Sequence, residues 1–214
     1  MENLAKYVDH TNLKVDAKKA DIEKLCNEAK EYGFYSVCVN PVNVSLAKSF
    51  LKDSSVKIAS VIGFPLGESR TEVKVMETKM AIQDGADEID MVLSISRLVD
   101  GDLDYVYNDI KAITELGTPV KVIFETNKLT DEQIVTATEL SIKAGAAFIK
   151  TSTGFLGDGA NEHVVDLMVK TANGRCKVKA SGGIRDYAAA KMYVDLGVDR
   201  LGTSSGVKIV TETK

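Results

Sequence analysis

The sequence predicts an α/β fold, a single-domain (β/α)8 TIM barrel of eight parallel strands spanning residues 1–214. Short apolar runs alternate with longer amphipathic segments along the whole chain, which is typical of parallel strands joined by crossover helices. The length of 214 residues fits one barrel domain of this kind. Eight strand-and-helix units in this length favour a closed barrel over an open, doubly wound sheet, which is the alternative.

Eight apolar runs are predicted as strands, and turn residues separate them from the helices. The predicted strands are residues 6–10, 36–39, 58–62, 88–93, 120–125, 148–151, 177–180 and 200–202. Six glycines end an amphipathic stretch just before a strand, as left-handed C-caps do, namely Gly33, Gly85, Gly117, Gly145, Gly174 and Gly197. Pro41 suits the first turn of a helix, and Ser69 with Glu72 and Thr130 with Gln133 indicate capping boxes.

Composition narrows the class of protein. With 44% hydrophobic and 27% charged residues the chain can bury a substantial core, and its net charge is -4 at pH 7. We find no basic run interleaved with aromatic residues and no apolar run of about 18 residues, so neither nucleic-acid binding nor a membrane span is expected. The first residues lack the pattern of a secretory signal, and the three cysteines are odd in number and widely spaced. Both features predict a cytoplasmic protein.

Cofactor and metal sites have little support in the sequence. Two histidines, His10 and His163, argue against a catalytic zinc site, whereas carboxylate-bound magnesium stays open at this point. The phosphate-binding GxxxxGK[ST] run and a GxGxxG segment opening a first helix are both absent. We therefore expect no nucleotide cofactor.

Two lysines lie inside apolar strand runs that end in small polar residues. Lys150 belongs to FIKTSTGF at residues 148–155, and Lys179 belongs to KVKASGGIR at residues 177–185. A lysine with its usual pKa of about 10.4 is almost entirely protonated at pH 7 and is a poor nucleophile. Two ammonium groups about 5 Å apart repel by roughly 3 kcal/mol, which would lower the pKa of one of them toward the range of Schiff-base chemistry. The alternative is that each is a solvated strand-end lysine.

Asp90, in the segment DEIDMV, is the predicted partner of these lysines. Strand alternation places Asp90 and Glu88 on the same face, and an inward carboxylate has to be paired or used because burying it alone is costly. Near Lys179, Asp90 would keep that lysine charged and leave Lys150 as the one that loses its proton. A purely structural salt bridge of Asp90 with Lys121 or Lys179 is the alternative.

Glycine-rich loops after the last two strands indicate a phosphate site. SGGI at residues 181–184 and GTSSG at residues 202–206 offer backbone N–H groups and hydroxyls at helix starts, which suit a phosphate dianion. Barrels of this type often bind phosphate at this position. The alternative is that these glycines only make tight turns.

Other strand ends carry polar residues of less certain use. Asp9 and His10 could orient each other, but no serine elbow accompanies them. Cys38, in the run SVCV, is interpreted as a core residue. The fifth strand ends in Glu125 followed by Thr126, so it also delivers polar groups to the predicted mouth of the barrel.

FIKTSTGF and KASGGIR together closely resemble the deoxyribose-phosphate aldolases. The resemblance covers essentially the whole chain, since DHT, VCVNP, VIGFPLG, GADEIDMV, VKVIFET and LGTSSG match that family's strand ends in order. It implies a class I aldolase on an α/β barrel that cleaves 2-deoxy-D-ribose 5-phosphate to D-glyceraldehyde 3-phosphate and acetaldehyde without a metal. The implied partners are a small sugar phosphate and an aldehyde. A homo-oligomer, either a dimer or a tetramer, is compatible with the sequence.

The resemblance also implies roles for individual residues. Lys150 would form the Schiff base, Lys179 would be the second active-site lysine, and Asp90 would relay protons. The implied phosphate contacts are Gly154, Ser181, Gly182, Gly183, Gly202, Ser204 and Ser205. Some members carry a lysine directly after TSTG, where this sequence has Phe155, so phosphate binding is expected to depend more on backbone N–H groups. Some also end in a tail with a tyrosine, whereas the last tyrosine here is Tyr193.

Two other classes of function stay open. Another phosphate-binding barrel enzyme, such as a transaldolase-like aldolase or a sugar-phosphate epimerase, would share the fold and the phosphate loops. A non-catalytic barrel that binds sugar phosphates would share them too, but it would have no use for paired buried lysines.

Overall fold

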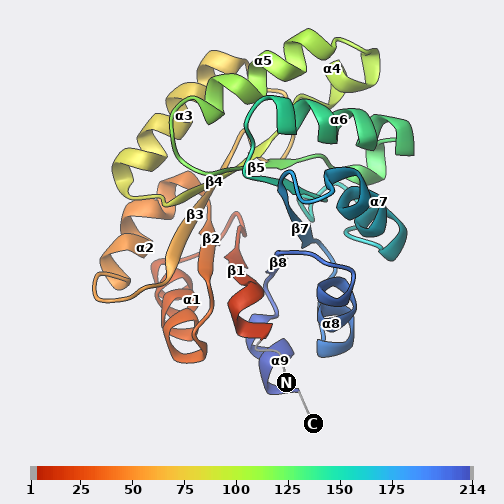
Figure 1. Ribbon diagram of the computed structural model, residues 1–214. Coiled ribbons are helices and arrows are strands. Elements are labelled where there is room, and N and C mark those ends of the chain that lie inside the picture. The colour runs from red at the N-terminus through yellow and green to blue at the C-terminus, as the bar shows by residue number, and fades with distance from the viewer. Residues whose placement is uncertain (1–3, 213–214) are drawn as a thin grey trace.

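The computed structural model describes residues 4–212 and contains a closed barrel of eight parallel strands in sequence order (Figure 1). The last strand pairs with the first and closes the barrel, and the long helices lie around its outside. The prediction of a (β/α)8 barrel is confirmed, and the open sheet is excluded. The predicted single-domain extent, residues 1–214, stays a prediction. Residues 213–214, which end the chain where a tail was considered, lie outside the described part.

The strands lie where the sequence predicts them, within two residues at each end. They are β1 (Val8–Asn12), β2 (Ser36–Val39), β3 (Lys57–Ile62), β4 (Glu88–Val92), β5 (Val120–Ile123), β6 (Phe148–Lys150), β7 (Lys177–Ser181) and β8 (Arg200–Thr203). The first strand begins and ends two residues later than predicted, because Leu4–Tyr7 form a 3-10 helix, η1, instead of extended chain.

Helices follow the strands in the predicted alternation, with two helices, the short α4 and the longer α5, between β4 and β5. The helices are α1 (Lys19–Tyr32), α2 (Val44–Phe50), α3 (Thr71–Asp84), α4 (Ile95–Asp100), α5 (Leu103–Thr114), α6 (Asp131–Lys143), α7 (Glu162–Ala172), α8 (Tyr187–Asp195) and α9 (Gly206–Thr211). Two 3-10 turns, η2 (Pro41–Asn43) and η3 (Thr126–Lys128), lie after β2 and β5.

The observed helix ends show which capping signals in the sequence located a helix end correctly. The capping box of Thr130 and Gln133 is confirmed at the start of α6, and Pro41 begins η2. The capping box of Ser69 and Glu72 is wrong, because α3 begins at Thr71 with Arg70 as its N-cap and no side-chain cap. All six predicted C-cap glycines have φ between 67° and 108°, a region that side chains rarely enter.

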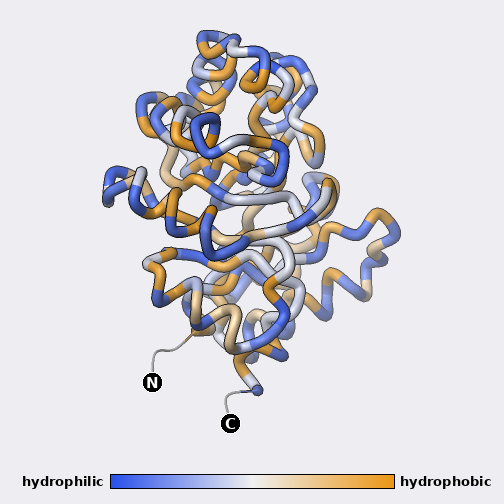
Figure 2. The backbone as a smooth tube through the Cα atoms, turned by 90° about the vertical axis from the view of Figure 1, so that its right-hand side faces the viewer, coloured by the Kyte–Doolittle hydropathy of each residue, from blue (hydrophilic) through white to orange (hydrophobic). Residues whose placement is uncertain are grey.

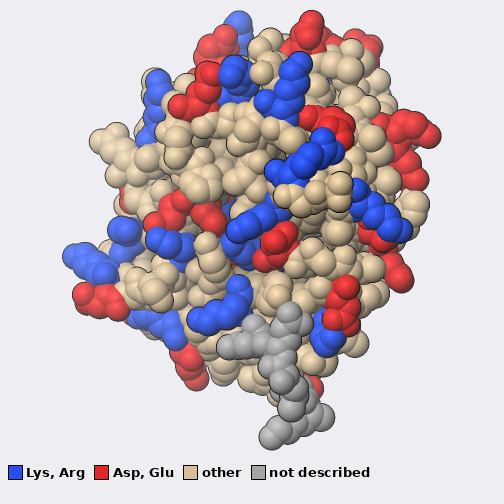
Figure 3. Space-filling view, in the orientation of Figure 1, with Lys and Arg blue, Asp and Glu red and all other residues tan. Residues whose placement is uncertain are grey.

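The apolar core lies between the outer face of the barrel and the helices. Alternating hydropathy along the helices is visible in Figure 2, and α1 is an example, since Ile22, Leu25, Cys26 and Ala29 are buried at helical spacing. The interpretation of Cys38 as a core residue is confirmed, because it is fully buried in a small apolar cluster. None of the helices in residues 4–212 has the length and apolar character of a membrane span. Acidic and basic side chains are interspersed on the face seen in Figure 3.

Candidate active site

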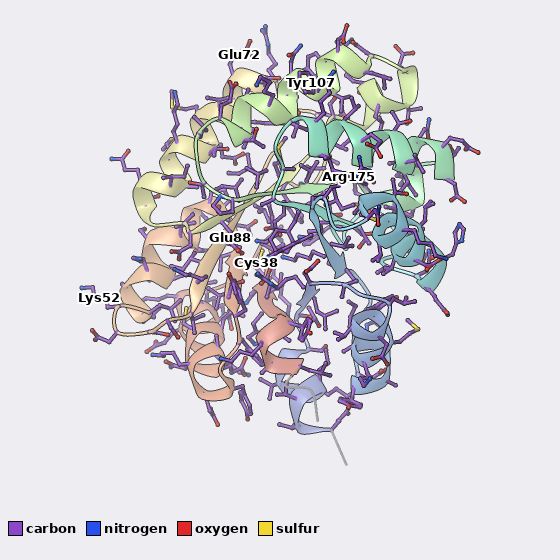
Figure 4. All side chains as sticks on the ribbon, viewed as in Figure 1. Cys38, Lys52, Glu72, Glu88, Tyr107 and Arg175 are labelled. Carbon is purple, nitrogen blue, oxygen red and sulfur yellow. The ribbon has the colours of Figure 1, made fainter. Side chains whose placement is uncertain are left out.

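Charged side chains fill the inside of the barrel, where strand alternation turns every second residue inward. Strand register brings the lysines together, since Lys150 on β6 is the direct neighbour of Lys179 on β7, and Asp90 on β4 is the direct neighbour of Lys121 on β5. Glu88 points into the middle of the ring of strands, whereas the labelled side chains of outer helices lie at its periphery (Figure 4). The register therefore concentrates charge at one level of the barrel.

Asp90 is the centre of this cluster. Its Oδ2 accepts hydrogen bonds from Lys150 Nζ and Lys179 Nζ, both at 2.8 Å, and its Oδ1 accepts one from Lys121 Nζ at 2.8 Å. The structure thus brings the three predicted catalytic residues into direct contact. It also makes the salt bridges that were the alternative for Asp90, since Asp90 pairs with both Lys121 and Lys179.

Lys150 differs from the other basic residues of the cluster in its proton affinity. Burial is the largest influence and lowers the pKa of Lys150; the nearby Asp90 carboxylate opposes this, and the Lys179 charge lowers the pKa further. The net result is a pKa below the usual lysine value. The sequence-based explanation, in which repulsion from Lys179 does most of the work, is therefore corrected, because loss of solvation contributes more.

Lys179 and Lys121 behave in the opposite way. Burial by itself would lower the pKa of Lys179, but Asp9 and Asp90 outweigh it, so the pKa is raised. The same competition raises the pKa of Lys121, which contacts Glu88 at 2.6 Å in addition to Asp90. The pKa of Asp90 lies well below its usual value because three lysines outweigh its burial. Lys179 and Lys121 therefore stay charged beside an ionised Asp90.

The balance of charges in the cluster explains why Lys150 is the amine with the lowered pKa. The cluster contains three carboxylates, on Asp9, Glu88 and Asp90, and four basic groups, on Lys121, Lys150, Lys179 and Arg200. Buried ions are stable only when they are paired, so the surplus positive charge is the costly one. Lys150 donates to one carboxylate only, while Lys179 contacts both Asp9 and Asp90. Loss of the Lys150 proton makes the cluster neutral.

Sequence reasoning did not bring the whole cluster together. Lys121, inside the apolar run VKVIF, was named only as a possible salt-bridge partner of Asp90, and Arg200 was not considered. Asp9 was considered only as a partner of His10, which is wrong: Asp9 contacts Lys179 and Arg200, and His10 contacts Glu28 at 2.7 Å. The partners of Asp9 lie far away in sequence and no local pattern reveals them.

A cavity of about 490 Å³ opens at the carboxyl ends of the strands and reaches Lys150. Six of the predicted phosphate contacts line it, namely Gly154, Ser181, Gly182, Gly183, Gly202 and Ser204. Ser205 is not among the lining residues, because it forms the N-cap position of α9 and its N–H donates to Thr203 Oγ1 at 2.9 Å. Lys179 and Asp90 lie behind Lys150, away from the cavity lining.

The other side of the cavity was not predicted. Residues of the first strand, of the loop after it and of α1 line it, including Asn12, Lys14, Lys24 and Glu28. At the mouth, the half-exposed Phe155 ring contacts the Phe64 ring edge-on with centroids 5.2 Å apart. The site therefore combines a polar floor with one aromatic edge. Within residues 4–212, no cluster of three or more His, Cys, Asp or Glu is arranged to hold a metal ion.

Comparison with known proteins agrees with the geometry. Residues 3–210 match the family model described as DeoC/LacD family aldolase. A deoxyribose-phosphate aldolase of Thermococcus gammatolerans is 55% identical, covering 97% of this chain and 95% of the relative. One of Exiguobacterium sibiricum is 56% identical, covering 98% and 96%. Among solved structures, the tetrameric deoxyribose phosphate aldolase of Aeropyrum pernix superposes with a TM-score of 0.92 at 36% identity, covering 98% of this chain and 90% of that one. The chain therefore belongs to the DeoC/LacD family of aldolases and is a carbon–carbon lyase.

Proposed function

We propose that this chain is a class I aldolase that reversibly cleaves 2-deoxy-D-ribose 5-phosphate to D-glyceraldehyde 3-phosphate and acetaldehyde through a Schiff base on Lys150. One observation carries the proposal. Of the three lysines inside the barrel, Lys150 alone both lines the cavity and has a lowered pKa. An amine that is uncharged and reachable is what imine formation with a carbonyl requires.

The first half of the reaction uses the Lys150 amine. The neutral Nζ attacks the aldehyde carbon of the open-chain sugar, and loss of water leaves a protonated imine that draws electrons from the neighbouring bond. The water oxygen comes from the sugar aldehyde, and its protons come from the amine and the relay. The carboxylate of Asp90, 2.8 Å from Lys150 Nζ, stabilises the cation that forms.

The second half needs a base and then an acid. Removal of the C3 hydroxyl proton breaks the C2–C3 bond, releases D-glyceraldehyde 3-phosphate and leaves an enamine on Lys150. Protonation of the enamine at C2 and hydrolysis of the resulting imine release acetaldehyde and return the free amine. We assign the proton transfers to Asp90 and Lys179, acting through a bound water. Their 2.8 Å hydrogen bond supports this relay.

Phosphate would bind on the side of the cavity that the loops after β7 and β8 form. Gly182 and Gly183 line the cavity and have φ of 87° and 79°, conformations that favour glycine. Ser181, Gly202 and Ser204 complete this wall, whereas Ser205 is the predicted contact with the weakest geometric support. Phosphate binding there would position the sugar aldehyde toward Lys150.

The decisive experiment traps the Schiff base. Acetaldehyde and borohydride are expected to add an ethyl group to wild-type protein on the peptide that contains Lys150, as measured by mass spectrometry. Lys150→Ala should lose both the adduct and the turnover of 2-deoxy-D-ribose 5-phosphate. Lys177→Ala, which removes an exposed lysine on β7, is the matched control and should keep both. An adduct that survives in Lys150→Ala would remove Lys150 from this role.

The donor substrate separates the proposal from the related chemistry considered above. A transaldolase-like enzyme would use a ketose donor, so acetaldehyde and dihydroxyacetone offered separately with D-glyceraldehyde 3-phosphate should give product only with acetaldehyde. Product with dihydroxyacetone alone would favour the transaldolase-like activity. A cytoplasmic location stays a prediction, which cell fractionation would test.

A homo-oligomer also belongs to this proposal. The Aeropyrum pernix relative is described as tetrameric, and α3 here exposes Val73, Met76 and Met80 on one face. Glu72 and Lys79 flank Met76, so two antiparallel copies of α3 would place Glu72 of one copy near Lys79 of the other. Sedimentation should show a dimer or tetramer that Met76→Glu weakens. A wild-type monomer at all concentrations would contradict this.

A further inference from the structure

Glu125, at the end of β5, is a buried acidic residue that the proposed reaction leaves unused. Its exposed fraction is 0%, and its backbone is left-handed with φ 55° and ψ 60°. Among residues 4–212 only one other non-glycine residue, Asn173, has positive φ, and asparagine tolerates this region well at a helix end. A glutamate does not share that tolerance, so the surrounding structure has to hold Glu125 in place.

The side chain of Glu125 reaches across to the loop that follows Lys150. Its Oε2 accepts a hydrogen bond from the backbone N–H of Thr153 at 3.0 Å and a short one from the Thr153 hydroxyl. Thr153 Oγ1 in turn accepts a hydrogen bond from the backbone N–H of Phe155 at 3.1 Å. One carboxylate oxygen therefore fixes both ends of the turn Thr153–Gly154–Phe155, directly and through one hydroxyl.

We propose that Glu125 is a positioning residue for substrate phosphate, acting through the Thr153 hydroxyl on the turn of residues 153–155. All three residues of this turn line the cavity together with Lys150. The inference rests on the proposed function, because it assumes that the sugar phosphate binds there. Glu125 itself is not among the lining residues, so it acts without touching substrate.

The chemistry of the contact requires a carboxylate. A carboxylate only accepts hydrogen bonds, and Thr153 presents two donors to the same oxygen. In Glu125→Gln the amide oxygen could accept both, but the amide nitrogen would then replace Oε1. This buried oxygen has no hydrogen-bond partner among the described residues. The variant would bury donors without acceptors, which is costly.

Orientation of the threonine hydroxyl follows from the same contacts. Its hydrogen points to Glu125, so its lone pairs face the N–H of Phe155. Gly154, with φ 79°, lies between the two anchored residues, and its N–H is one of the predicted phosphate contacts. Loss of either anchor would release this N–H from its position, while leaving the Lys150 side chain unchanged.

The test compares phosphorylated substrate with acetaldehyde. Glu125→Gln and Thr153→Val should each raise KM for 2-deoxy-D-ribose 5-phosphate about tenfold, the order expected for loss of a hydrogen bond to a charged group. The rate of acetaldehyde trapping on Lys150 should stay at the wild-type level, because acetaldehyde carries no phosphate. Thr153→Ser, which retains the hydroxyl, should keep the wild-type KM. Thr138→Val removes another buried threonine hydroxyl, in α6, and controls for that loss.

The double variant Glu125→Gln/Thr153→Val should be no worse than the worse single variant, since both changes break the same contact. Additive effects, an unchanged KM, or equal losses in Thr153→Ser and Thr153→Val would overturn the inference. If Glu125→Gln does not fold, the Thr153 variants decide alone. Wild-type protein that forms no acetaldehyde adduct would instead overturn the proposed function, so the two failures are distinguishable.

Discussion

Buried lysines occur in two regions of this molecule, and the two regions use them differently. Between α3 and the strands, Lys74 is fully buried and donates to Asp109 at 2.7 Å and to the carbonyl of Val92 at 3.0 Å. One lysine here meets one carboxylate. Inside the barrel, four basic groups share three carboxylates, and Lys150 has the lowered pKa. The two regions differ in charge balance, and Lys150 also lines the cavity, whereas Lys74 does not.

The ion pair of Lys74 and Asp109, with equal positive and negative charge, holds elements together. The barrel cluster has more basic than acidic groups, and one of its amines, on Lys150, has a lowered pKa. Lys74 joins α3 to the end of β4 and to α5, and Thr71 adds a hydrogen bond to the same Asp109 at 2.8 Å. In the barrel, the amine with the fewest carboxylate partners is the one that reaches the cavity. The same residue type therefore forms a structural ion pair in one region and supplies the proposed nucleophile in the other.

The largest expected effect comes from breaking the centre of the barrel cluster. Asp90→Asn should lower turnover of 2-deoxy-D-ribose 5-phosphate by about 10²–10⁴-fold, the usual contribution of a positioned acid–base group. Acetaldehyde should still form an imine, because the Asp90 carboxylate raises the pKa of Lys150 and its removal lowers that pKa further. Steady-state rates and borohydride trapping measure the two steps. Turnover of 2-deoxy-D-ribose 5-phosphate at the wild-type rate in Asp90→Asn would show that Asp90 does not act as a relay.

The next effect concerns the balanced pair. Lys74→Met leaves Asp109 buried without its cation, which should lower the free energy of unfolding by about 3–5 kcal/mol. Chemical denaturation measures this value. Replacing both partners, as Lys74→Met/Asp109→Leu, should recover much of the loss, since no unpaired charge stays behind. The pH profile of acetaldehyde trapping should not move in either variant. A shifted profile would show that this pair also affects the barrel interior.

The smallest expected effect concerns the influence of Lys179 on the pKa of Lys150. The charge of Lys179 lowers the pKa of Lys150, so Lys179→Met should raise it. Trapping needs the neutral amine and is lost as the pH falls through the pKa of Lys150. The acid limb of the trapping rate against pH should therefore move to higher pH in the variant. Lys177→Met, on the same strand but exposed, should leave the limb in place. An unmoved limb in Lys179→Met would mean that the charge of Lys179 does not affect the pKa of Lys150.

Local sequence signals were enough for the architecture. Alternating apolar runs, a capping box at Thr130 and glycines such as Gly33 and Gly85 located the elements, because hydrophobic period and left-handed caps act over a few residues. Ser69 with Glu72 matched the same capping pattern and failed, since α3 starts at Thr71, one residue later than that box requires. The two lysine segments likewise identified Lys150 and Lys179 as candidates for paired chemistry.

Only the tertiary structure showed which of the buried lysines lines the cavity and has a lowered pKa. Asp9 contacts Lys179 and Arg200, which lie 170 and 191 residues further along the chain, so no local pattern could place them. Burial, which contributes most to the lowered pKa of Lys150, exists only after eight strands close around it. The contact of Glu125 with Thr153 likewise depends on β5 lying beside β6. Sequence supplies the charged groups, but closure of the barrel sets their solvation and their neighbours, and these determine proton affinity.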